Sequence, residues 1–577
     1  MRYVFDLETD GLLDAVTKVH CVILKDIDSG HIINVKVKKA LQLLEEADLI
    51  IGHNIIKFDI PVLKKLFGFT PQGKVFDTIV AARLVYPDIR DKDFANKDLP
   101  RKYIGSHSLA AYGFRLGNLK GDFDGGDWQT YSEEMLQYCI QDVEVTHNLY
   151  KKILDKGFSE QAMQLEHDVV TLINKQELHG FTFDVDKGEA LAAKLNVRRF
   201  EIEDELQELF PPRTISIPFM PKVNNKARGY VKGELFYKTK VETFNPSSRQ
   251  HIAERLKSLY DWQPKEFTND GSPKLDDETL SKLPYKEAKI LAEHFLLDKR
   301  IAQLSTGNQA WLSKRKGNKI HGTCNTNSTV TGRASHTSPN LGQIPSTAVP
   351  YGKECRELFT VPEGYKLVGI DISGLEVRML AHFMSKYDNG AYTDVVLNGD
   401  IHTTTQKLAG LDSRDVAKRF YYCFLYGGGV KKIAQVIDKK INIASAIKKR
   451  FLNNLPALNK LIEQVQSASE RGHLVGLDKR QVKVRSAHSA LNTLLQSAGA
   501  IVCKQWLVEF DRAVKKIPNV QQVVWVHDEI QVECLEKDAQ TIGELAVEAI
   551  ERTGKHFNLR IPLTGEFNIG NNWSETH

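Results

Sequence analysis

Alternating and helix-spaced apolar residues predict an α/β domain over residues 1–155. Tyr3, Phe5 and Leu7 occupy every second position, which is the period of a strand with one buried face. A second apolar run over 19–27 predicts a strand that pairs with the first. Apolar residues at helical spacing predict helices over 38–47, 58–67 and 135–154.

The rest of the chain divides into a helical segment, an insertion and a larger mixed region. Helical, charged sequence fills 156–210 and ends at two prolines. Prolines, aromatics and lysines then predict an irregular insertion over 211–243. Further on, an apolar strand over 366–373 runs into a helix. Two β-rich runs, 523–526 and 530–534, predict a hairpin with an acidic turn.

The composition narrows the class of protein. The 577 residues are 42% hydrophobic with a net charge of only +5, which suits folded domains and excludes a polycationic tail or coat-type binder. The seven scattered cysteines contain no C-x-x-C pair, so we expect neither a zinc ribbon nor a disulfide framework. There is no signal-peptide pattern, and no apolar run reaches the roughly 18 residues of a membrane span. We therefore expect a cytoplasmic protein with no membrane partner.

Four carboxylates of the N-terminal domain form a first candidate metal site. Asp6 and Glu8 are two residues apart on the predicted strand, so both side chains project from one face. Asp59 opens a helix, and Tyr138 and Asp142 share one helix face at a spacing of four. Oxygen ligands of this kind hold Mg²⁺ or Mn²⁺, and two such ions can activate a water for attack on a phosphodiester. A solvated strand end is the alternative for Asp6 and Glu8 taken alone, and a helix N-cap is the expectation for Asp77.

A second acidic set lies in the C-terminal half. Asp371 ends the apolar strand over 366–373, where a carboxylate is costly unless it is bound to something. Asp528 and Glu529 lie in the turn of the predicted hairpin. An ordinary polar hairpin tip is the alternative for that turn alone. The two aspartates together predict a second metal site.

A helix between these two acidic segments suits a nucleotide. Arg414, Lys418, Tyr422 and Tyr426 recur every four residues along one helix face. Cations meet phosphates, and an aromatic ring stacks on a base. The alternative is a solvated basic face that merges into an aromatic core.

Two further groups of polar side chains suit contact with a duplex. They can donate to the minor-groove acceptors that every correct base pair shares, which checks pair shape without reading sequence. A packed polar face is the alternative for the helical group. The first group, in a turn-rich region, is Arg333, Asn340 and Gln343, and the second, spaced by four on a predicted helix, is His488, Asn492 and Gln496.

The combination of these motifs resembles known families. Asp6-Leu7-Glu8, the stretch 54–59 and Tyr138-x-x-x-Asp142 resemble the three motifs of the DEDDy 3′→5′ exonucleases. The strand with Asp371, the nucleotide helix and the His-Asp-Glu hairpin resemble motifs A, B and C of family A DNA polymerases. Runs such as VTGRASH, FLYG and VHDEIQVE are similar to the replicative polymerases of the T-seven-type podophage branch. The resemblance implies an RNase H-like exonuclease domain followed by a right-hand polymerase domain of α/β and α+β class.

The resemblance also implies a template-directed DNA polymerase with proofreading, and it assigns roles to residues. Asp371, Asp528 and the carbonyl of Ile372 would hold two Mg²⁺ in the polymerase site, with Glu529 in support. Two more Mg²⁺ in the exonuclease site would be held by Asp6, Glu8 and Asp142 beside Asp59, with Mn²⁺ as a substitute and Tyr138 orienting the water. His402 joins Arg414 and Lys418 at the triphosphate, and Glu376 is the steric gate against a 2′-hydroxyl. Tyr422 stacks at the insertion site and implies tolerance of dideoxynucleotides.

Domains and partners follow from the same resemblance. After the exonuclease domain at 1–155, we expect a thumb at 156–300, fingers at 396–499, and a palm split between 301–395 and 500–577. Expected partners are primer-template DNA, dNTPs, a phage helicase-primase and a single-stranded DNA-binding protein. In the infected bacterial host, some relatives dock thioredoxin on a longer thumb insertion. The shorter segment 211–243 leaves thioredoxin binding open.

The net charge is concentrated in that insertion. Residues 211–243 contain seven cations and two acids, so their net charge of +5 equals that of the whole chain. We expect this patch to lie along the DNA path and to steepen the salt dependence of binding, with another partner or a plain surface loop as alternatives. Its expected DNA contacts are Lys222, Lys226, Arg228 and Lys232.

Three alternative functions compete with a proofreading DNA polymerase. A single-subunit RNA polymerase shares the palm and the nucleotide helix, but Glu376 and the exonuclease motifs disfavour it. A nuclease with an inactive polymerase half is disfavoured because Asp371, Lys418 and Asp528 are all present. A non-enzymatic DNA-binding protein is disfavoured because it would have no use for two acidic metal sites.

Overall fold

The N-terminal strand and helices form as their hydrophobic patterns predict. The computed structural model describes residues 1–118, 127–264, 266–268 and 271–577. A five-stranded sheet with the order β3-β2-β1-β4-β5 begins the chain, with β1 antiparallel to β2 and parallel to β4. Its strands are β1 (Arg2–Thr9), β2 (Val19–Asp26), β3 (Ile32–Asn34), β4 (Leu49–Gly52) and β5 (Lys74–Asp77). The predicted pairing of the first two strands is therefore confirmed.

Helices lie along this sheet and bury their apolar stripes against it. One cluster of buried residues joins Val4, Cys21 and Ile51 of the sheet to Leu136 and Val143 of α6. This packing holds a long helix against β1, the strand that carries the first two predicted metal ligands. The helices of this region are α1 (Val37–Glu45), α2 (Asp59–Phe67), α3 (Thr78–Val85), α4 (Ile89–Asp93), α5 (Leu109–Leu116) and α6 (Glu133–Leu154).

A second sheet forms where the sequence predicts an apolar strand and an acidic hairpin. Its order is β17-β18-β14-β19, and β14 pairs antiparallel with both neighbours. The strands are β14 (Tyr365–Ile372), β17 (Gln521–Val526), β18 (Glu529–Leu535) and β19 (Gly565–Gly570). The helices beside them are α7 (Glu160–His179), α14 (Leu375–Asp388), α21 (Ala490–Val514) and α22 (Ala539–His556). Val368, Ile370 and Val532 lie in one hydrophobic core with residues of α7, α14, α21 and α22.

A group of shorter helices follows α14 and shares that core. The helices are α15 (Ala391–Asn398), α16 (Ile401–Ala409), α17 (Arg414–Leu425), α18 (Val430–Val436), α19 (Ile441–Asn453) and α20 (Pro456–Ser469). Two short ribbons complete the region, β15 (His473–Val475) with β16 (Gln481–Lys483), and β11 (Thr323–Asn325) with β12 (Ser335–Thr337). On α17 the buried residues are Ala417, Phe420, Tyr421, Phe424 and Leu425, so its other face is left for the predicted nucleotide contacts.

The described residues form two compact units. The first comprises Met1–Phe181, His321–Ile344 and Thr360–His577, and the second comprises Thr182–Ile320 and Pro345–Phe359. The predicted thumb at 156–300 differs from the second unit at both ends. Helix α7 packs within the first unit, and the second unit extends to Ile320 and includes Pro345–Phe359, which lie in the predicted palm at 301–395. Among the residues described, no helix combines the length and the hydrophobicity that crossing a bilayer requires.

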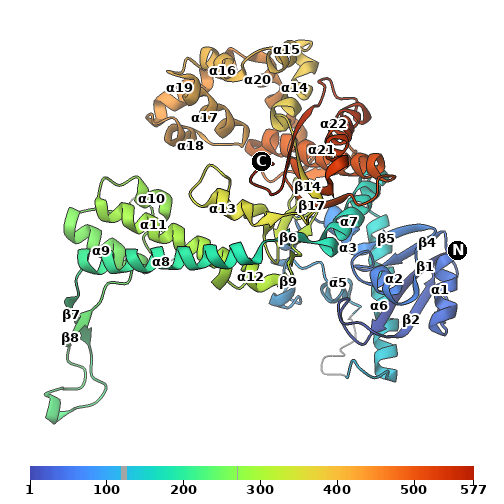
Figure 1. Ribbon diagram of the computed structural model, residues 1–577, viewed down its shortest axis with the longest axis horizontal. Helices are drawn as coiled ribbons and strands as arrows, with labels where there is room; N and C mark the ends of the chain where they lie inside the picture. The colour runs from blue at the N-terminus through green and yellow to red at the C-terminus, as the bar shows by residue number, and fades with distance from the viewer. Residues whose placement is uncertain (119–126, 265, 269–270) are drawn as a thin grey trace. The chain divides into compact units, whose positions relative to one another are not determined.

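The second unit is built on a long helix and carries a hairpin arm. Its main helices are α8 (Val185–Leu209), α9 (Arg249–Tyr260), α10 (Asp277–Ser281), α11 (Lys286–Ile301) and α12 (Trp311–Lys314). Between α8 and α9, β7 (Arg213–Phe219) pairs antiparallel with β8 (Phe236–Glu242) (Figure 1). The prediction of an irregular insertion over 211–243 is therefore wrong for the two strands, Arg213–Phe219 and Phe236–Glu242. Pro218 obscured the strand in the sequence, but a two-stranded ribbon tolerates proline because each strand has one unpaired edge.

Candidate active sites

The first acidic site lies where β1 faces α6. Asp6 and Glu8 of β1 and Cys139 of α6 offer ligand atoms that all lie within 4.8 Å of one another. The Cys139 Sγ donates toward Asp6 Oδ2 at 3.7 Å. Glu8 is only 7% exposed, so the predicted strand-end alternative does not describe it. Cys139 was not among the predicted site residues, although it directly follows Tyr138.

Asp59 and Asp142 complete this site from two helices. Both carboxylates are buried, Asp59 at the start of α2 and Asp142 on α6. Burial first, and then the charges of Asp77 and Asp142, raise the pKa of Asp59 to about 8. Such crowding is unfavourable for ionised carboxylates but fits a divalent cation, which offsets their charge. The structure thus places Asp59 within electrostatic reach of Asp142 and next to Leu7, which lies between Asp6 and Glu8 on β1.

Asp77 shapes the turn that leads to Asp59. Its carboxylate accepts hydrogen bonds from the backbone N–H groups of Asn54 (2.8 Å), Ile56 (3.0 Å) and Ile79 (3.1 Å). The bond from Ile79 confirms the predicted N-cap of α3. The two others hold a turn in which Asn54 adopts a φ of 68°. Asp77 is therefore a positioning residue for the start of α2.

Tyr138 lies on the same helix as Asp142 and is half-buried. Its ring makes an edge contact with Trp128, with the ring centroids 6.3 Å apart. The spacing of four residues places Tyr138 and Asp142 on one face of α6. The sequence did not predict this contact, because no local pattern links Trp128 to Tyr138, ten residues later.

The second acidic site is assembled by strand pairing. Asp371 ends β14 and lies opposite Glu529 of β18, and the backbone N–H of Ile372 donates to the Asp528 carbonyl at 3.1 Å. Burial among protein atoms, and then the charges of Asp528 and Glu529, raise the pKa of Asp371 to about 7, although part of the residue is exposed. Burial and the charge of Glu376 also raise the pKa of Asp528. Mutual repulsion of this kind marks a pair of carboxylates suited to cations.

Glu529 is held more firmly than its neighbour. Its Oε1 accepts from Trp573 Nε1 (2.6 Å) and Gln531 Nε2 (2.7 Å), and its Oε2 lies 2.7 Å from His577 Nδ1. Burial favours the neutral acid, but hydrogen bonds from His577, Gln531 and Trp573 lower the pKa of Glu529 below its ordinary value. Glu529 therefore stays ionised as a fixed charge beside Asp528. The partners Trp573 and His577 were not predicted, because they come from the far end of the chain.

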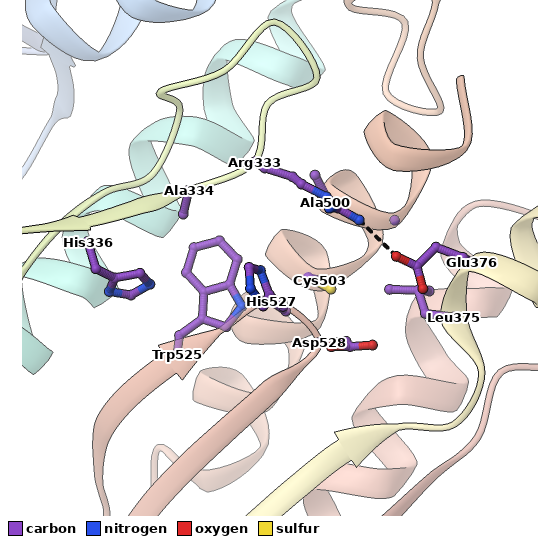
Figure 2. A pocket seen from close by; sticks show the side chains of 11 residues that line it. Arg333, Ala334, His336, Leu375, Glu376, Ala500, Cys503, Trp525, His527 and Asp528 are labelled. Atoms are coloured by element: carbon purple, nitrogen blue, oxygen red, sulfur yellow. Dashed lines mark hydrogen bonds and ion pairs between the residues drawn. The ribbon is translucent and has the colours of Figure 1, made fainter. Parts of the chain in front are cut away.

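A small cavity of about 40 Å³ lies between the two acidic segments and the strand β12. Figure 2 shows Arg333 reaching toward Glu376, with Trp525, His527 and Asp528 on the hairpin below. The Arg333 Nη2 donates to Glu376 Oε1 at 2.8 Å, and the Tyr426 hydroxyl lies 3.5 Å from the same oxygen. The steric-gate candidate therefore contacts both a predicted duplex-binding residue, Arg333, and the residue that caps the nucleotide helix, Tyr426.

The nucleotide helix presents the predicted face to solvent. On α17, Arg414 and Lys418 are exposed, and the rings of Tyr422 and Tyr426 stack with centroids 6.3 Å apart. Tyr426 caps the helix end rather than lying within it. Arg414 is bound by Asp400, with Nε–Oδ2 at 2.6 Å, and the His402 ring lies 5.7 Å from that of Tyr422. The structure thus places His402 beside α17, within electrostatic reach of Arg414 and Lys418.

The predicted DNA contacts occupy different surroundings. Asn340 and Gln343 flank a short turn, and Gln343 is exposed. His488 is exposed in the 3₁₀ turn Ala487–Ser489, so its predicted place on the helix is wrong; α21 begins only at Ala490. Asn492 donates to the Leu425 carbonyl at 2.9 Å, which satisfies one free carbonyl at the end of α17. Gln496 is half-buried on α21, and the hairpin cations Lys222, Lys226, Arg228 and Lys232 are all exposed.

Comparison with known proteins accounts for both acidic regions. Residues 224–575 match DNA polymerase family A, and residues 5–157 match a 3′–5′ exonuclease. The chain is 36% identical to the DNA-directed DNA polymerases of Enterobacteria phage T3 and Escherichia phage T7, with full coverage of both chains in each alignment. It is 24% identical to DNA polymerase I of Aquifex aeolicus over 99% of this chain and 95% of the relative. The solved POL domain of Pol1 from M. smegmatis, bound to primer-template and dNTP, shares the fold with a TM-score of 0.74 at 18% identity, covering 99% of this chain and 96% of that one.

Proposed function

This chain belongs to DNA polymerase family A and carries a 3′–5′ exonuclease domain, and we propose that it copies phage DNA and proofreads its own product. The observation that carries the proposal is the pairing of the Asp371 strand with the Asp528 hairpin next to Glu376, whose Oε1 lies 3.5 Å from the hydroxyl of Tyr426 at the end of α17, the helix that exposes Arg414 and Lys418. The expected exonuclease and right-hand polymerase architecture agrees with the family matches and with the fold of the solved relative.

The donor set of the polymerase site fits divalent cations, on which domains of this family depend. Asp371 and Asp528, with the Ile372 carbonyl, would hold two Mg²⁺ there. When bound, the ions supply a lowered pKa for the attacking primer 3′-hydroxyl and charge neutralisation for the departing pyrophosphate. Glu529, kept ionised by its hydrogen bonds, fixes the orientation of the turn that carries Asp528.

The residues of α17 and its neighbours bind the incoming dNTP. Arg414 and Lys418 meet the triphosphate, and His402 reaches it from beside Tyr422. Arg414 exchanges its bond to Asp400 for the phosphates when the nucleotide arrives. Tyr422 stacks on the base, and Glu376 excludes a ribose 2′-hydroxyl. The tyrosine at 422 also makes the site tolerant of dideoxynucleotides.

The exonuclease site removes a nucleotide from an unpaired 3′ end. Asp6, Glu8 and Asp142 would hold two Mg²⁺, which Mn²⁺ can replace, with Asp59 beside them. Tyr138 orients the attacking water from α6. The burial of these carboxylates excludes bulk water, which strengthens their interaction with any bound cation.

The hairpin arm β7–β8 grips duplex DNA through its exposed cations. Its strands alternate so that Ile217 pairs with Lys238 and Ile215 with Lys240, which puts cations and apolar groups on one face. Replacing Lys222, Lys226, Arg228 and Lys232 with glutamine should flatten the salt dependence of DNA binding, by about 0.9 in log–log slope for each phosphate that is no longer neutralised. An unchanged slope would show that the arm serves another partner.

The enzyme acts in the infected host cytoplasm with a helicase-primase and a single-stranded DNA-binding protein. Primer extension on a long single-stranded template tests the activity directly, with dNTPs compared with NTPs. Adding thioredoxin across a salt series tests the arm: no effect supports a self-sufficient grip, and a large gain in product length would identify thioredoxin as its partner. Extension with NTPs alone would instead favour an RNA polymerase.

A further inference from the structure

Four charged side chains form a fully buried cluster in the first unit. Glu166, Asp478, Arg480 and Lys504 are each at most 3% exposed, and their two positive and two negative charges balance. They come from three distant segments: α7, the turn between β15 and β16, and α21. Burying four charges is costly, so their retention calls for a role beyond packing.

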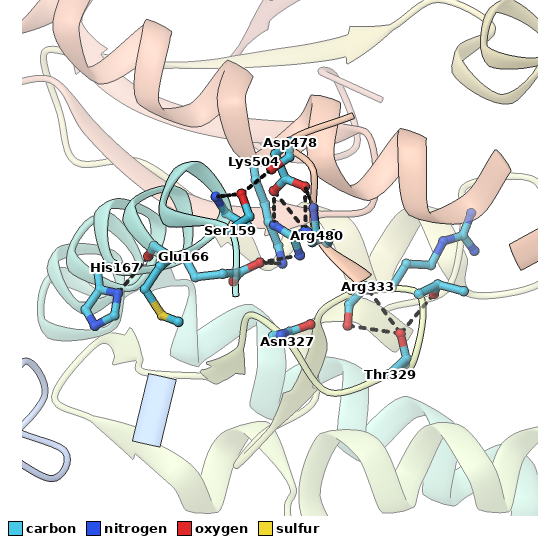
Figure 3. A network of polar contacts seen from close by, with 12 residues as sticks. Ser159, Glu166, His167, Asn327, Thr329, Arg333, Asp478, Arg480 and Lys504 are labelled. Carbon is cyan, nitrogen blue, oxygen red and sulfur yellow. Dashed lines mark hydrogen bonds and ion pairs between the residues drawn. The ribbon is translucent and has the colours of Figure 1, made fainter. Parts of the chain in front are cut away.

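Arg480 is the centre of the cluster. Its Nη2 donates to Asp478 Oδ2 at 2.6 Å, and its Nη1 donates to Glu166 Oε1 at 2.7 Å. Lys504 Nζ donates to the same Glu166 oxygen. Burial opposes the charge of Arg480, but Glu166 and Asp478 hold its pKa above the ordinary value, so it remains a cation. The guanidinium plane is therefore fixed from two sides by carboxylates (Figure 3).

The cluster forms the floor beneath the loop that carries Arg333. A Cβ at Gly332 would lie 3.1 Å from Arg480 Nη1 and 3.8 Å from Lys504 Nζ, so the loop backbone rests on both cations. Gly332 also adopts a φ of +79°, which favours glycine. Within the loop, the Arg333 N–H donates to Thr329 Oγ1 at 3.0 Å. The next side chain is Arg333, which binds Glu376 at 2.8 Å.

We propose that Arg480 and Lys504 are positioning residues for Arg333. They set the height and direction of the loop 327–333, so that Arg333 meets both Glu376 and the primer end. The proposal rests on the proposed polymerase function and on the predicted contact of Arg333 with the DNA duplex. An apolar floor would fill the same space, whereas the guanidinium of Arg480 and the ammonium of Lys504 are each tied to a carboxylate and so keep one position beneath Gly332.

The first test removes one positive charge from the buried cluster and then, in a double variant, makes the cluster neutral again. Lys504→Met leaves an excess negative charge in the cluster, whereas Glu166→Gln with Lys504→Met leaves one neutral ion pair between Asp478 and Arg480. We expect the single variant to lower kcat for primer extension by roughly tenfold to 10²-fold, since small displacements of positioned groups have effects of that size. Lys504→Arg keeps the positive charge and should therefore keep most of the wild-type kcat. The control is Lys175→Met, which removes a surface pair with Asp511 (3.2 Å) and should change nothing.

The second test is a double-mutant cycle with Arg333→Ala. If Lys504 acts through Arg333, Lys504→Met will cause no further loss of kcat once Arg333 is alanine, while its loss of thermal stability persists in both backgrounds. Additive losses of kcat, or wild-type kinetics in a folded Lys504→Met enzyme, would overturn the proposal. If Lys504→Met fails to fold, the balanced double variant takes its place in the cycle.

Failure of the proposed function gives a different pattern. If the wild-type enzyme did not extend a primer with dNTPs, the proposed function would fail before any variant is compared. Extension by Arg333→Ala at the wild-type rate would overturn the role of Arg333 and with it the positioning proposal, but it would leave the proposed polymerase activity standing. Loss of extension by Arg333→Ala, followed by an additive loss with Lys504→Met, would overturn only the positioning role. Single-strand degradation by the same preparations reports folding independently, because the exonuclease carboxylates lie on β1, α2 and α6.

Discussion

The two acidic sites of this chain use similar ligands in opposite surroundings. In the exonuclease site, Glu8, Asp59 and Asp142 are 7%, 4% and 3% exposed, and burial raises the pKa of Asp59 to about 8. In the polymerase site, Asp371 is exposed and Asp528 half-buried, and the pKa of Asp371 rises to about 7. This difference fits the proposed functions, in which the first site receives a single-strand end and the second a duplex end.

The supporting residues differ in the same way. Asp77 and the strand β1 fix the exonuclease carboxylates through backbone hydrogen bonds and packing. The polymerase carboxylates depend on a hairpin turn in which His527 adopts a φ of 58° and its carbonyl accepts from Trp525 Nε1. The first set of carboxylates is held by backbone hydrogen bonds and sheet–helix packing, and the second by a hairpin turn that lines a cavity of about 40 Å³. Four predictions test how independent the two sites are.

The largest expected effect is on extension. Asp371→Ala should reduce primer extension by roughly 10³-fold, because losing a metal ligand removes several kcal/mol of transition-state stabilisation. Degradation of a single strand should stay within about twofold of the wild type. Both rates can be read from one labelled primer on a gel. Normal extension by this variant would remove Asp371 from the site.

The reciprocal change should affect the other activity alone. Asp6→Ala with Glu8→Ala should reduce degradation of single strands by roughly 10³-fold for the same reason, while extension persists. The control variant is Asp10→Ala, which removes a nearby exposed carboxylate that binds Thr17 rather than the site. Degradation by the double variant at the wild-type rate would show that the metal ligands lie elsewhere.

The third prediction concerns the choice between ribose and deoxyribose, which only the polymerase site makes. Glu376→Ala should raise the use of NTPs relative to dNTPs by roughly tenfold to 10²-fold, because the variant loses the side chain that crowds the 2′-hydroxyl. The same change frees Arg333 from its ion pair. The ratio of kcat/KM values for the two nucleotides measures the effect. An unchanged ratio would reject Glu376 as the gate.

The smallest expected effect is a difference in pH dependence. A carboxyl group whose pKa is raised is protonated below that pKa. A cation must displace the proton of a ligand such as Asp371, and a proton on Asp59, beside the ligands, removes negative charge that favours the cation. As the pH falls, the Mg²⁺ concentration for half-maximal rate should therefore rise from about pH 8 for degradation and from about pH 7 for extension, approaching tenfold per pH unit for one displaced proton. Measuring both activities from about pH 6.5 to 9 checks this. Coincident curves would contradict the electrostatic difference between the sites.

Local patterns in the sequence were enough to place most of the candidate residues. The strand period put Asp6 and Glu8 on one face, and the spacing of four put Arg414, Lys418 and Tyr422 on one face of α17, as the structure has them. These features depend on the backbone period alone, which a short window of sequence reveals.

Long-range contacts were not predictable in this way. The ribbon over 211–243 depends on pairing across its whole length, and Pro218 argued against a strand. The bond between Glu166 and Arg480 joins residues 314 positions apart. The bond from Trp573 to Glu529 likewise joins separate segments of the fold. No local period carries such information, because it arises only when the segments pack.

A complementation assay tests the central claim, that one chain carries two independent catalytic sites, most directly. A primer with a mismatched 3′ end and a 5′ label is incubated on its template with dNTPs and Mg²⁺. Wild-type enzyme should trim and then extend it; Asp371→Ala should only trim; and Asp6→Ala with Glu8→Ala should leave most of it unchanged. Mixing the two variants should restore full-length product. Failure of the mixture, while each variant keeps its own activity on a suitable substrate, would contradict two separable sites.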